Sequence, residues 1–229
     1  MLIKKWEKLP ADMQVEAVRP YYERLRKKNF SLFWKRVFDF VTSTLMLIVL
    51  SPLFLVLALA IKIDSRGPVF FRQVRVTQYG KKFRIFKFRT MVNDADKKGA
   101  QVTLDNDERI TKVGRFIRKC RLDEVSQLID IWRGKMTFVG TRPEVPKYVE
   151  MYTDEMRATL LLPAGVTSEA SIKFKNEDEF LKDAENAEDV YVNVVLPQKM
   201  EGNLQSLKRQ GFWRDIGTMF KTVAAVLRR

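Results

Sequence analysis

The chain has 229 residues, 46% hydrophobic and 31% charged, which suits one packed domain with appendages and argues against wholesale disorder. It contains one cysteine and no histidine, which excludes intrachain disulfides, Ser-His and Cys-His catalytic arrangements, and zinc sites built on imidazole. Its formal charge is +14, and most of the excess lies between Lys62 and Arg121, a local field that attracts nucleic acid, anionic lipid headgroups or phosphorylated substrates.

Residues 1–30 are interpreted as a separate N-terminal interfacial segment. The stretch "DMQVEAVRPYYERLRKKNF" mixes valine, leucine and tyrosine with many charged residues. This composition predicts a surface helix, interrupted near Pro20, that lies on lipid headgroups.

Residues 31–66 are predicted to be embedded in a membrane. The run from Phe40 to Ile61 has no charge over about 22 residues, which is long enough for a helix to cross a bilayer. Proline removes a backbone donor, so the helix should bend at Ser51-Pro52, where the serine hydroxyl can satisfy a freed carbonyl. Cations flank the run on both sides. The pattern alone leaves two structures open, a re-entrant hairpin and a single kinked span.

Residues 67–229 are predicted to form a catalytic domain that begins with a β-hairpin. Alternating β-formers and cations from Val69 to Phe88, with Tyr79-Gly80 as the turn, are typical of such a hairpin. Basic residues with aromatics between them also occur in nucleic-acid-binding proteins. No recognition helix, nucleotide-binding repeat or zinc motif accompanies them, so we expect no nucleic-acid partner.

Two adjacent acids, Asp123 and Glu124, follow the most cationic part of the chain in "TKVGRFIRKCRLDEVSQLIDIWRG". The apolar spacing predicts two helices with a break near Arg121-Leu122. In one interpretation Asp123 caps the second helix and Glu124 complements its dipole. In the other, the pair holds a nucleophile beside phosphate-binding cations. Spacing alone favours the cap and leaves the nucleophile open.

The segment "GKMTFVGTRPEVPKY" predicts a tight connection into a helix that begins at Pro143. Arg142 would then lie just before a helix start, whose backbone donors favour an anion, or it is an exposed loop arginine. Near the C-terminus, Phe212–Leu227 is amphipathic, with an apolar stripe that includes Trp213 and Phe220. This helix either packs on the domain or lies on the membrane.

Six pieces occur in a characteristic order: "KRVFD", an apolar run broken by "SP", "GPVFFRQVR", "KFRTM", "RITKVGRFIRKCRLDEVSQL" and "GKMTFVGTRPE". From about Lys35 to Ile172 the chain resembles the bacterial sugar transferases, and more narrowly the monotopic phosphoglycosyl transferases that begin membrane glycan assembly. The resemblance implies an α+β, mainly helical fold. It also implies a membrane helix re-entrant at Ser51-Pro52. The small domain, with amphipathic helices at the interface, would lie on the cytoplasmic face of the bacterial inner membrane.

The resemblance further implies a reaction. Members of this family move a phosphosugar from a UDP-sugar to polyprenol phosphate, expected to be undecaprenyl phosphate, release UMP, and use Mg²⁺. Asp123 would be the nucleophile that forms an aspartyl phosphosugar. Both acids are candidate Mg²⁺ ligands, and Glu124 would help hold the ion or handle a proton. Arg142 matches the arginine of the family's Pro-Arg-Pro motif. The candidates for binding the nucleotide or its phosphates are Arg142, Pro143, Lys87, Arg89, Arg115 and Arg118.

Two departures from the family pattern lie beside these residues. Ser126 and Thr141 stand where the family commonly has proline. They support an alternative in which the protein is a membrane-anchored, catalytically inactive binder of UDP-sugars or polyprenyl diphosphates. We nevertheless expect activity because the acid pair and Arg142 are intact. The chain has the length expected of the minimal catalytic form, and its sequence indicates neither the sugar nor the oligomeric state.

Overall fold

The structure is a computed structural model that describes residues 3–93, 95, 107–174 and 187–227. This part of the chain is mainly helical with short strands, so the predicted α+β class is confirmed. Its α-helices are α1 (Arg19–Arg26), α2 (Asn29–Val49), α3 (Ser51–Asp64), α4 (Lys112–Lys119), α5 (Leu128–Trp132), α6 (Pro146–Val149), α7 (Glu169–Lys173), α9 (Ala187–Val190), α10 (Leu196–Lys208) and α11 (Phe212–Leu227). Its strands are β1 (Phe70–Phe71), β2 (Val74–Val76), β3 (Lys82–Arg84), β4 (Lys87–Phe88), β5 (Met136–Val139) and β6 (Ala164–Thr167).

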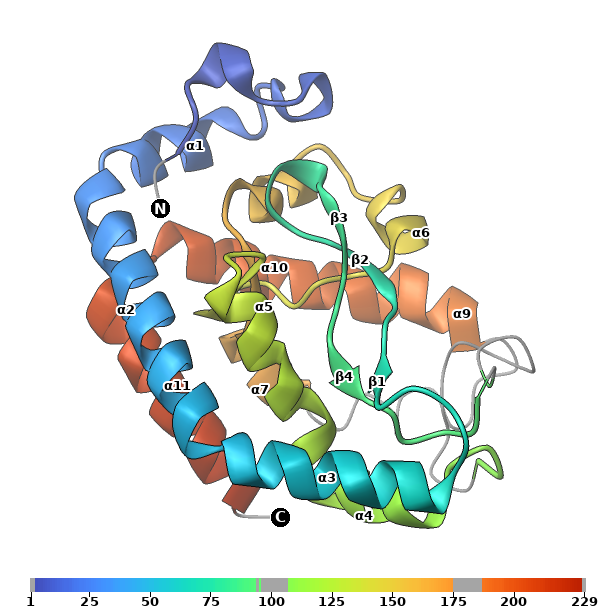
Figure 1. The fold of residues 1–229 in the computed structure, drawn as a ribbon. Coiled ribbons are helices and arrows are strands. Elements are labelled where there is room, and N and C mark those ends of the chain that lie inside the picture. Colours follow the sequence, from blue (N-terminus) through green and yellow to red (C-terminus); the bar gives the residue numbers. More distant parts are fainter. Residues whose placement is uncertain (1–2, 94, 96–106, 175–186, 228–229) are drawn as a thin grey trace.

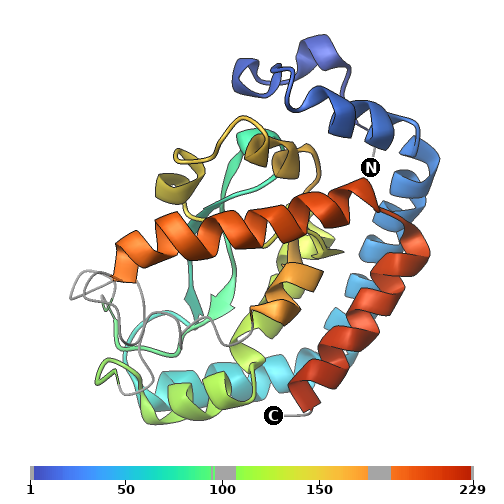
Figure 2. The same ribbon diagram turned by 180° about the vertical axis from the view of Figure 1, so that it is seen from behind.

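The long apolar run forms two helices that meet at an angle. α2 and α3 are bent by 61° at their junction, and Pro52 lies in the first turn of α3. The hydroxyl of Ser51 donates to the carbonyl of Ile48 at 2.8 Å, so the predicted break and its local satisfaction are both confirmed. No one helix among the described residues has the length and hydropathy needed to cross a bilayer, whereas α2 and α3 taken together do. α11 runs along α2, and α4 runs along α3 (Figures 1 and 2).

Charged side chains join α2 to the domain before the bend. The ammonium of Lys35 lies 2.5 Å from a carboxylate oxygen of Asp215 in α11, and both side chains are almost fully buried. Asp39 accepts a hydrogen bond of 2.6 Å from the hydroxyl of Thr137 in β5. Arg36 donates to two carbonyls at the end of α5, at 2.7 and 3.0 Å. These bonds fix α2 against three elements of the domain.

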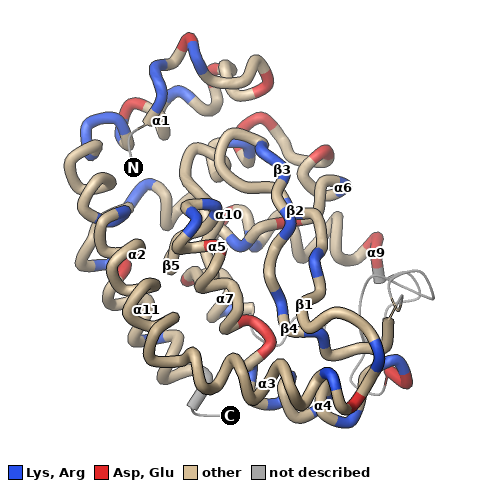
Figure 3. The backbone as a smooth tube through the Cα atoms, viewed as in Figure 1, with Lys and Arg blue, Asp and Glu red and all other residues tan. Residues whose placement is uncertain are grey.

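The hairpin predicted for residues 69–88 is confirmed. β2 pairs with β3 and β1 pairs with β4, both antiparallel. The chain turns at Tyr79 and Gly80, whose φ angles are 59° and 70°. Phe83 is buried and Arg84 is exposed, as the alternation predicts. The hairpin therefore exposes Lys82 and Arg84 to solvent, and strands β2 to β4 carry Lys and Arg without Asp or Glu (Figure 3).

A second pair of strands, β5 and β6, is parallel and was not predicted as a pair. Its register places Met136 opposite Ala164. Gly165 in β6 and Gly140, directly after β5, touch so closely that a Cβ on Gly165 would lie 2.1 Å from the backbone nitrogen of Gly140. No side chain fits between these two glycines, so backbone atoms hold the loop that carries Arg142 against β6.

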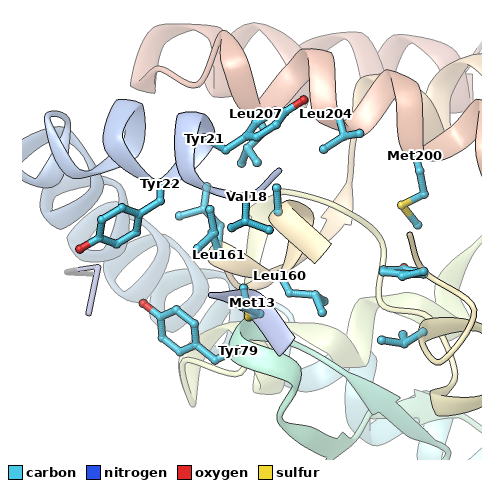
Figure 4. Close-up of a cluster of buried hydrophobic side chains, with 14 of the residues drawn as sticks. Met13, Val18, Tyr21, Tyr22, Tyr79, Leu160, Leu161, Met200, Leu204 and Leu207 are labelled. Atoms are coloured by element: carbon cyan, nitrogen blue, oxygen red, sulfur yellow. The ribbon is translucent and has the colours of Figure 1, made fainter. Parts of the chain in front are cut away.

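The N-terminal residues pack into the main core. The helix predicted to be interrupted near Pro20 begins instead at Arg19, and two short 3-10 turns, Trp6–Lys8 and Ala11–Met13, precede it. Proline is well accommodated there because the first turn of a helix does not use its missing N–H. The buried side chains of this core include Met13, Val18, Tyr21, Leu160, Leu161, Met200, Leu204 and Leu207 (Figure 4). Contact of this segment with lipid remains a prediction.

The last helix turns its polar side toward the domain. Asp215 and Thr218 are buried, whereas Trp213 and Phe220 are 81% and 72% exposed. We call the large exposed side chains of α2, α3 and α11 the apolar surface; they include Phe30, Trp34, Phe40, Leu45, Ile48, Val49, Leu55, Val56, Leu59, Ile63, Trp213, Phe220 and Val223. Exposed apolar groups on this scale mark a surface that binds protein or membrane.

Candidate active site

A left-handed residue separates α4 from the acid pair. α4 ends at Lys119, and Arg121 has φ 54° and ψ 24°, after which a 3-10 helix runs from Leu122 to Gln127 and leads into α5. The predicted break is therefore confirmed. The prediction that Asp123 caps the second helix is wrong, because Arg121 occupies the N-cap position and no side chain caps this helix. A non-glycine residue in this conformation costs about 1 kcal/mol or more, which the surrounding packing must offset.

Two cations hold Glu124. The ammonium of Lys87 in β4 lies 3.0 Å from one carboxylate oxygen, and the guanidinium of Arg142 donates to both oxygens. Burial alone would raise the pKa of Glu124, but the charges of Arg142 and Lys87 outweigh burial and hold the pKa well below its usual range. Glu124 in turn raises the pKa of Arg142. The carboxylate is ionised at neutral pH and has no oxygen left without a donor.

Asp123 has the opposite environment. Its carboxylate makes no hydrogen bond or ion pair with another residue in the described part of the chain. Burial raises its pKa, Lys87 and Arg118 oppose that effect with their charges, and the neighbouring Glu124 adds to it. The pair therefore consists of one carboxylate fixed by cations and one carboxylate whose oxygens are available to a ligand.

The four predicted cations beyond Arg142 fall into two groups. Lys87 and Arg118 lie near the acid pair, and Arg118 also donates to the hydroxyl of Thr90 at 2.9 Å. Arg89 is buried and donates to the carbonyls of residues 65 and 66 at the end of α3, at 2.7 and 2.9 Å. The side chain of Arg115 is exposed on α4 and makes no hydrogen bond or ion pair with any described residue. Phosphate binding by all four remains a prediction.

The helix predicted to start at Pro143 starts three residues later. α6 begins at Pro146, and the preceding segment is extended, with the carbonyl of Glu144 accepting from the N–H of Val76 at 2.9 Å. The hydrogen bond between Val76 and Glu144 at the edge of the hairpin outweighs the preference of Pro143 to start a helix. Pro143 is buried, and its carbonyl accepts from Arg75. No helix N-terminus therefore stands behind Arg142, and its guanidinium alone would contact an anion.

A buried polar network behind Arg142 was missed in the sequence. Glu144 accepts from the hydroxyl of Tyr191 at 2.9 Å, and the ammonium of Lys199 and the guanidinium of Arg75 lie 3.6 and 3.9 Å from its carboxylate oxygens. These groups tie the Arg142 loop to the helix that continues into α10. The only signal for them in the sequence was the acid that directly follows "TRP".

The two family departures are accommodated locally. Ser126 is fully buried, and its hydroxyl donates to the carbonyl of Asp123 at 3.2 Å. Thr141 uses its carbonyl to accept from the N–H of Gly165 at 2.8 Å. The bond from Ser126 holds the acid pair in place, and the bond from Thr141 holds the Arg142 loop. Neither departure therefore removes a candidate functional group from the site.

The acid pair offers a metal ion one open carboxylate. No group of three or more potential metal-ligating side chains lies together in the described residues. Mg²⁺ is commonly held by one or two carboxylates together with substrate phosphates and water. Asp123 fits that pattern, whereas Glu124 fits it only after releasing one of its cations.

A third acid near the hairpin is expected to make stability depend on pH. Asp130 is buried, accepts from the N–H of Phe86 at 2.8 Å, and has its pKa raised by burial from 3.8 to about 6. At Asp130 the folded protein therefore binds more protons than the unfolded chain between about pH 4 and 6, so the contribution of this residue to stability falls as pH rises through that window, by about 3 kcal/mol at most. Asp130→Asn should flatten this fall. Denaturant unfolding in detergent at pH 4, 5, 6 and 7 measures it, and an unchanged slope would contradict the assignment.

The sequence matches a known protein family. The sequence profile described as bacterial sugar transferase matches residues 30–229. The chain is 35% identical over 200 residues to a UDP-glucose:undecaprenyl-phosphate glucose-1-phosphate transferase of Klebsiella pneumoniae, which covers 85% of this chain and 40% of the relative. It is 36% identical over 194 residues to the protein of the same name in Escherichia coli K12, with 82% and 39% covered.

A shorter relative is covered more fully. The protein of that same name in Caulobacter vibrioides is 32% identical over 197 residues, which covers 84% of this chain and 69% of the relative. The chain thus spans about two fifths of the length of the Klebsiella and Escherichia relatives and about two thirds of the Caulobacter one. A profile that matches nearly the whole chain, together with these identities, is decisive: the chain belongs to the bacterial sugar transferase family.

Proposed function

We propose that this protein is a phosphoglycosyl transferase that moves a phosphosugar from a UDP-sugar to undecaprenyl phosphate, releases UMP, and so begins the assembly of a bacterial surface glycan. The relatives' names describe undecaprenyl-phosphate sugar phosphotransferases. The observation that carries the proposal is the difference between the two carboxylates of the acid pair. Glu124 is held by Arg142 and Lys87, whereas the carboxylate oxygens of Asp123 are available to a ligand.

The proposed reaction has two displacements at one phosphorus atom. A carboxylate oxygen of Asp123 attacks the phosphate next to the sugar, the phosphorus–oxygen bond to the nucleotide breaks, and UMP leaves with the bridging oxygen. An oxygen of undecaprenyl phosphate then attacks the same phosphorus, the bond to Asp123 breaks, and the carboxylate is restored. Covalent catalysis suits this pair of substrates because one is soluble in water and the other resides in lipid.

Cations make the first attack feasible. A carboxylate is repelled by a diphosphate until the charge is offset, and Arg118 and Lys87 already act on Asp123. Arg142, held by Glu124, would present its remaining donors to the diphosphate. Asp123 would be the residue that holds Mg²⁺, and the ion would supply a Lewis acid for the attack on the phosphate. The burial of Asp123 removes water that would otherwise weaken these interactions.

We further propose that α2 and α3 form a re-entrant hairpin in the cytoplasmic membrane and that the domain lies on its cytoplasmic face. The apolar surface and the 61° bend support this placement, as do the cations on both sides of the run. Single cysteines at Lys5 and Lys82, in a Cys120→Ser background, test it. An impermeant maleimide should label both positions in inverted vesicles and neither in intact spheroplasts. Labelling of the two positions from opposite sides would establish a single span.

The test of the reaction is UMP release. The full chain in detergent, with Mg²⁺ and undecaprenyl phosphate, is offered a panel of UDP-sugars, and we expect release with one sugar or a few related ones. Omission of undecaprenyl phosphate should limit release to one equivalent per enzyme, since the aspartyl phosphosugar then has no acceptor. Binding of a UDP-sugar by calorimetry without any UMP release would favour the inactive binding protein.

Arg142→Lys should lower kcat about 10- to 100-fold, because lysine keeps the charge and loses the fork that grips both oxygens of Glu124. Steady-state kinetics on the preferred UDP-sugar measures the loss. The matched control is Arg19→Lys, since Arg19 pairs with Glu23 on the exposed side of α1, where an ion pair contributes little. Equal kinetics for the two variants would refute a role for the fork.

A further inference from the structure

Two arginines lie over one aromatic ring beside the acid pair's helix, and the charge of a third acts on one of them. The guanidinium carbon of Arg72 lies 3.4 Å from the centroid of the Phe86 ring, and that of Arg133 lies 5.8 Å from it. Arg72 also donates to the carbonyl of Arg84 at 2.6 Å. Arg72 and Arg84 come from the hairpin, and Arg133 directly follows α5. We call these three residues the arginine cluster.

The cluster carries more positive charge than its surroundings offset. Burial lowers the pKa of Arg72, and the nearby charges of Arg133 and Arg84 lower it further, with Asp130 the one acid that opposes them. Asp130 already accepts the backbone N–H of Phe86. The Nε of Arg72 is buried without a hydrogen-bond partner in the described residues. Several cations held beside a single acid attract an anion.

The cluster borders the apolar surface. Trp132, the residue before Arg133, stacks on Phe40 of α2 with ring centroids 6.4 Å apart and an interplanar angle of 20°. Both rings are nearly half exposed. Arg36 donates to the carbonyl of Trp132 and lies against Gly134, so α2 fixes this edge. A ligand with a phosphate head and an apolar tail would find both chemistries side by side here.

We propose that the arginine cluster binds the phosphate of an anionic membrane phospholipid whose chains lie against Phe40 and Trp132. This inference rests on the proposed placement of α2 and α3 in the membrane. The site uses none of the groups that hold the acid pair, since Glu124 is held by Lys87 and Arg142. The lipid is inferred to be a ligand distinct from the two substrates, and it fixes the orientation of the domain on the bilayer. Displacement of the lipid by undecaprenyl phosphate added to the nanodiscs would instead assign the cluster to the acceptor.

The decisive variant changes only exposed members of the cluster. Arg84→Gln with Arg133→Gln removes two charges from side chains that are exposed, so folding is expected to be retained. The matched control is Lys81→Gln with Lys82→Gln, which removes the same charge from exposed side chains at the turn of the hairpin. Each protein is reconstituted in nanodiscs with equal phosphatidylglycerol and phosphatidylcholine. After mild detergent extraction, the retained lipids are counted by native mass spectrometry.

We expect wild type and control to retain phosphatidylglycerol in preference to phosphatidylcholine, and the cluster variant to lose at least about tenfold of that preference. Undiminished preference in the cluster variant, or an equal loss in the control, would overturn the proposal. Millimolar inorganic phosphate or UDP is added in parallel samples. Displacement of the lipid by either would instead identify a site for free phosphate or for nucleotide.

The same experiment separates this inference from the proposed function. A protein that inserts into nanodiscs and releases UMP, yet shows no lipid preference, would refute the arginine-cluster site alone. A protein that fails to insert at all would refute the proposed membrane placement, and the lipid site with it. UMP release in detergent reports on the acid pair independently of both.

Discussion

Asp123→Asn should lower UMP release by about a thousandfold or more, because the amide cannot form the bond to phosphorus. The change keeps the size of the side chain, and the wild-type carboxylate makes no bond to another described residue, so the fold should not depend on it. Initial rates with the preferred UDP-sugar measure the loss. Intact-mass analysis of wild type without acceptor should show an added phosphosugar, and the variant should show none.

The control for this change is Asp154→Asn, which alters an exposed aspartate outside the site and should leave the rate within about twofold. Thermal unfolding of both variants checks that they are folded. If Asp123→Asn turns over near the wild-type rate, the covalent route is wrong and the open carboxylate has another use. If it binds UDP-sugar as wild type does but releases no UMP, the loss lies in chemistry and not in binding.

Lys35→Met should destabilise the protein by about 3–5 kcal/mol, since it leaves a buried carboxylate without its cation. Lys35 and Asp215 have side chains that are 5% and 10% exposed, and their charged atoms lie 2.5 Å apart. Gln210 also donates to Asp215, at 2.9 Å, but an amide cannot replace the charge. Guanidinium unfolding in detergent, followed by circular dichroism, measures the effect.

A double variant tests whether the ion pair of Lys35 and Asp215 is the origin of the loss of stability. Lys35→Met with Asp215→Leu removes both charges and should recover most of the stability, because apolar side chains of similar volume can replace a buried ion pair. Lys27→Met, at an exposed position before α2, is the matched control and should change stability by less than about 0.5 kcal/mol. A double variant as unstable as Lys35→Met would mean that the pair is not the origin of the loss.

Local patterns predicted the local structure. The hairpin of residues 69–88 follows from alternation and a turn, and the bend at Ser51-Pro52 follows from a missing donor. Contacts between distant segments were not predictable in this way. The parallel pair of β5 and β6 joins residues that are far apart in sequence, and the N-terminal residues pack on α10 near the other end of the chain. Pro143 and Pro146 offer the same helix-start signal, and a hydrogen bond to Val76 decides between them.

In the candidate site, too, local features were predictable from the sequence, whereas contacts between distant residues were not. The acid pair and its neighbouring cations were visible in the sequence, but their roles depend on partners 37 and 18 positions away, Lys87 and Arg142. The capping interpretation of Asp123 was wrong because Arg121 adopts a left-handed conformation that arginine seldom takes. No spacing rule signals such a residue. The family resemblance supplied the nucleophile hypothesis, and the geometry leaves Asp123 free to act as one.

The buried attachments of α2 have a mechanical consequence. Lys35, Arg36 and Asp39 all bond to the domain, so α2 cannot tilt without breaking several polar contacts at once. If α2 and α3 lie in the bilayer as proposed, these two helices and the domain move as one rigid body. A mismatch in bilayer thickness would then be absorbed by the surrounding lipid and not by the protein. The height of Asp123 above the acyl chains, and hence its reach to a lipid phosphate, would stay constant from one membrane to another.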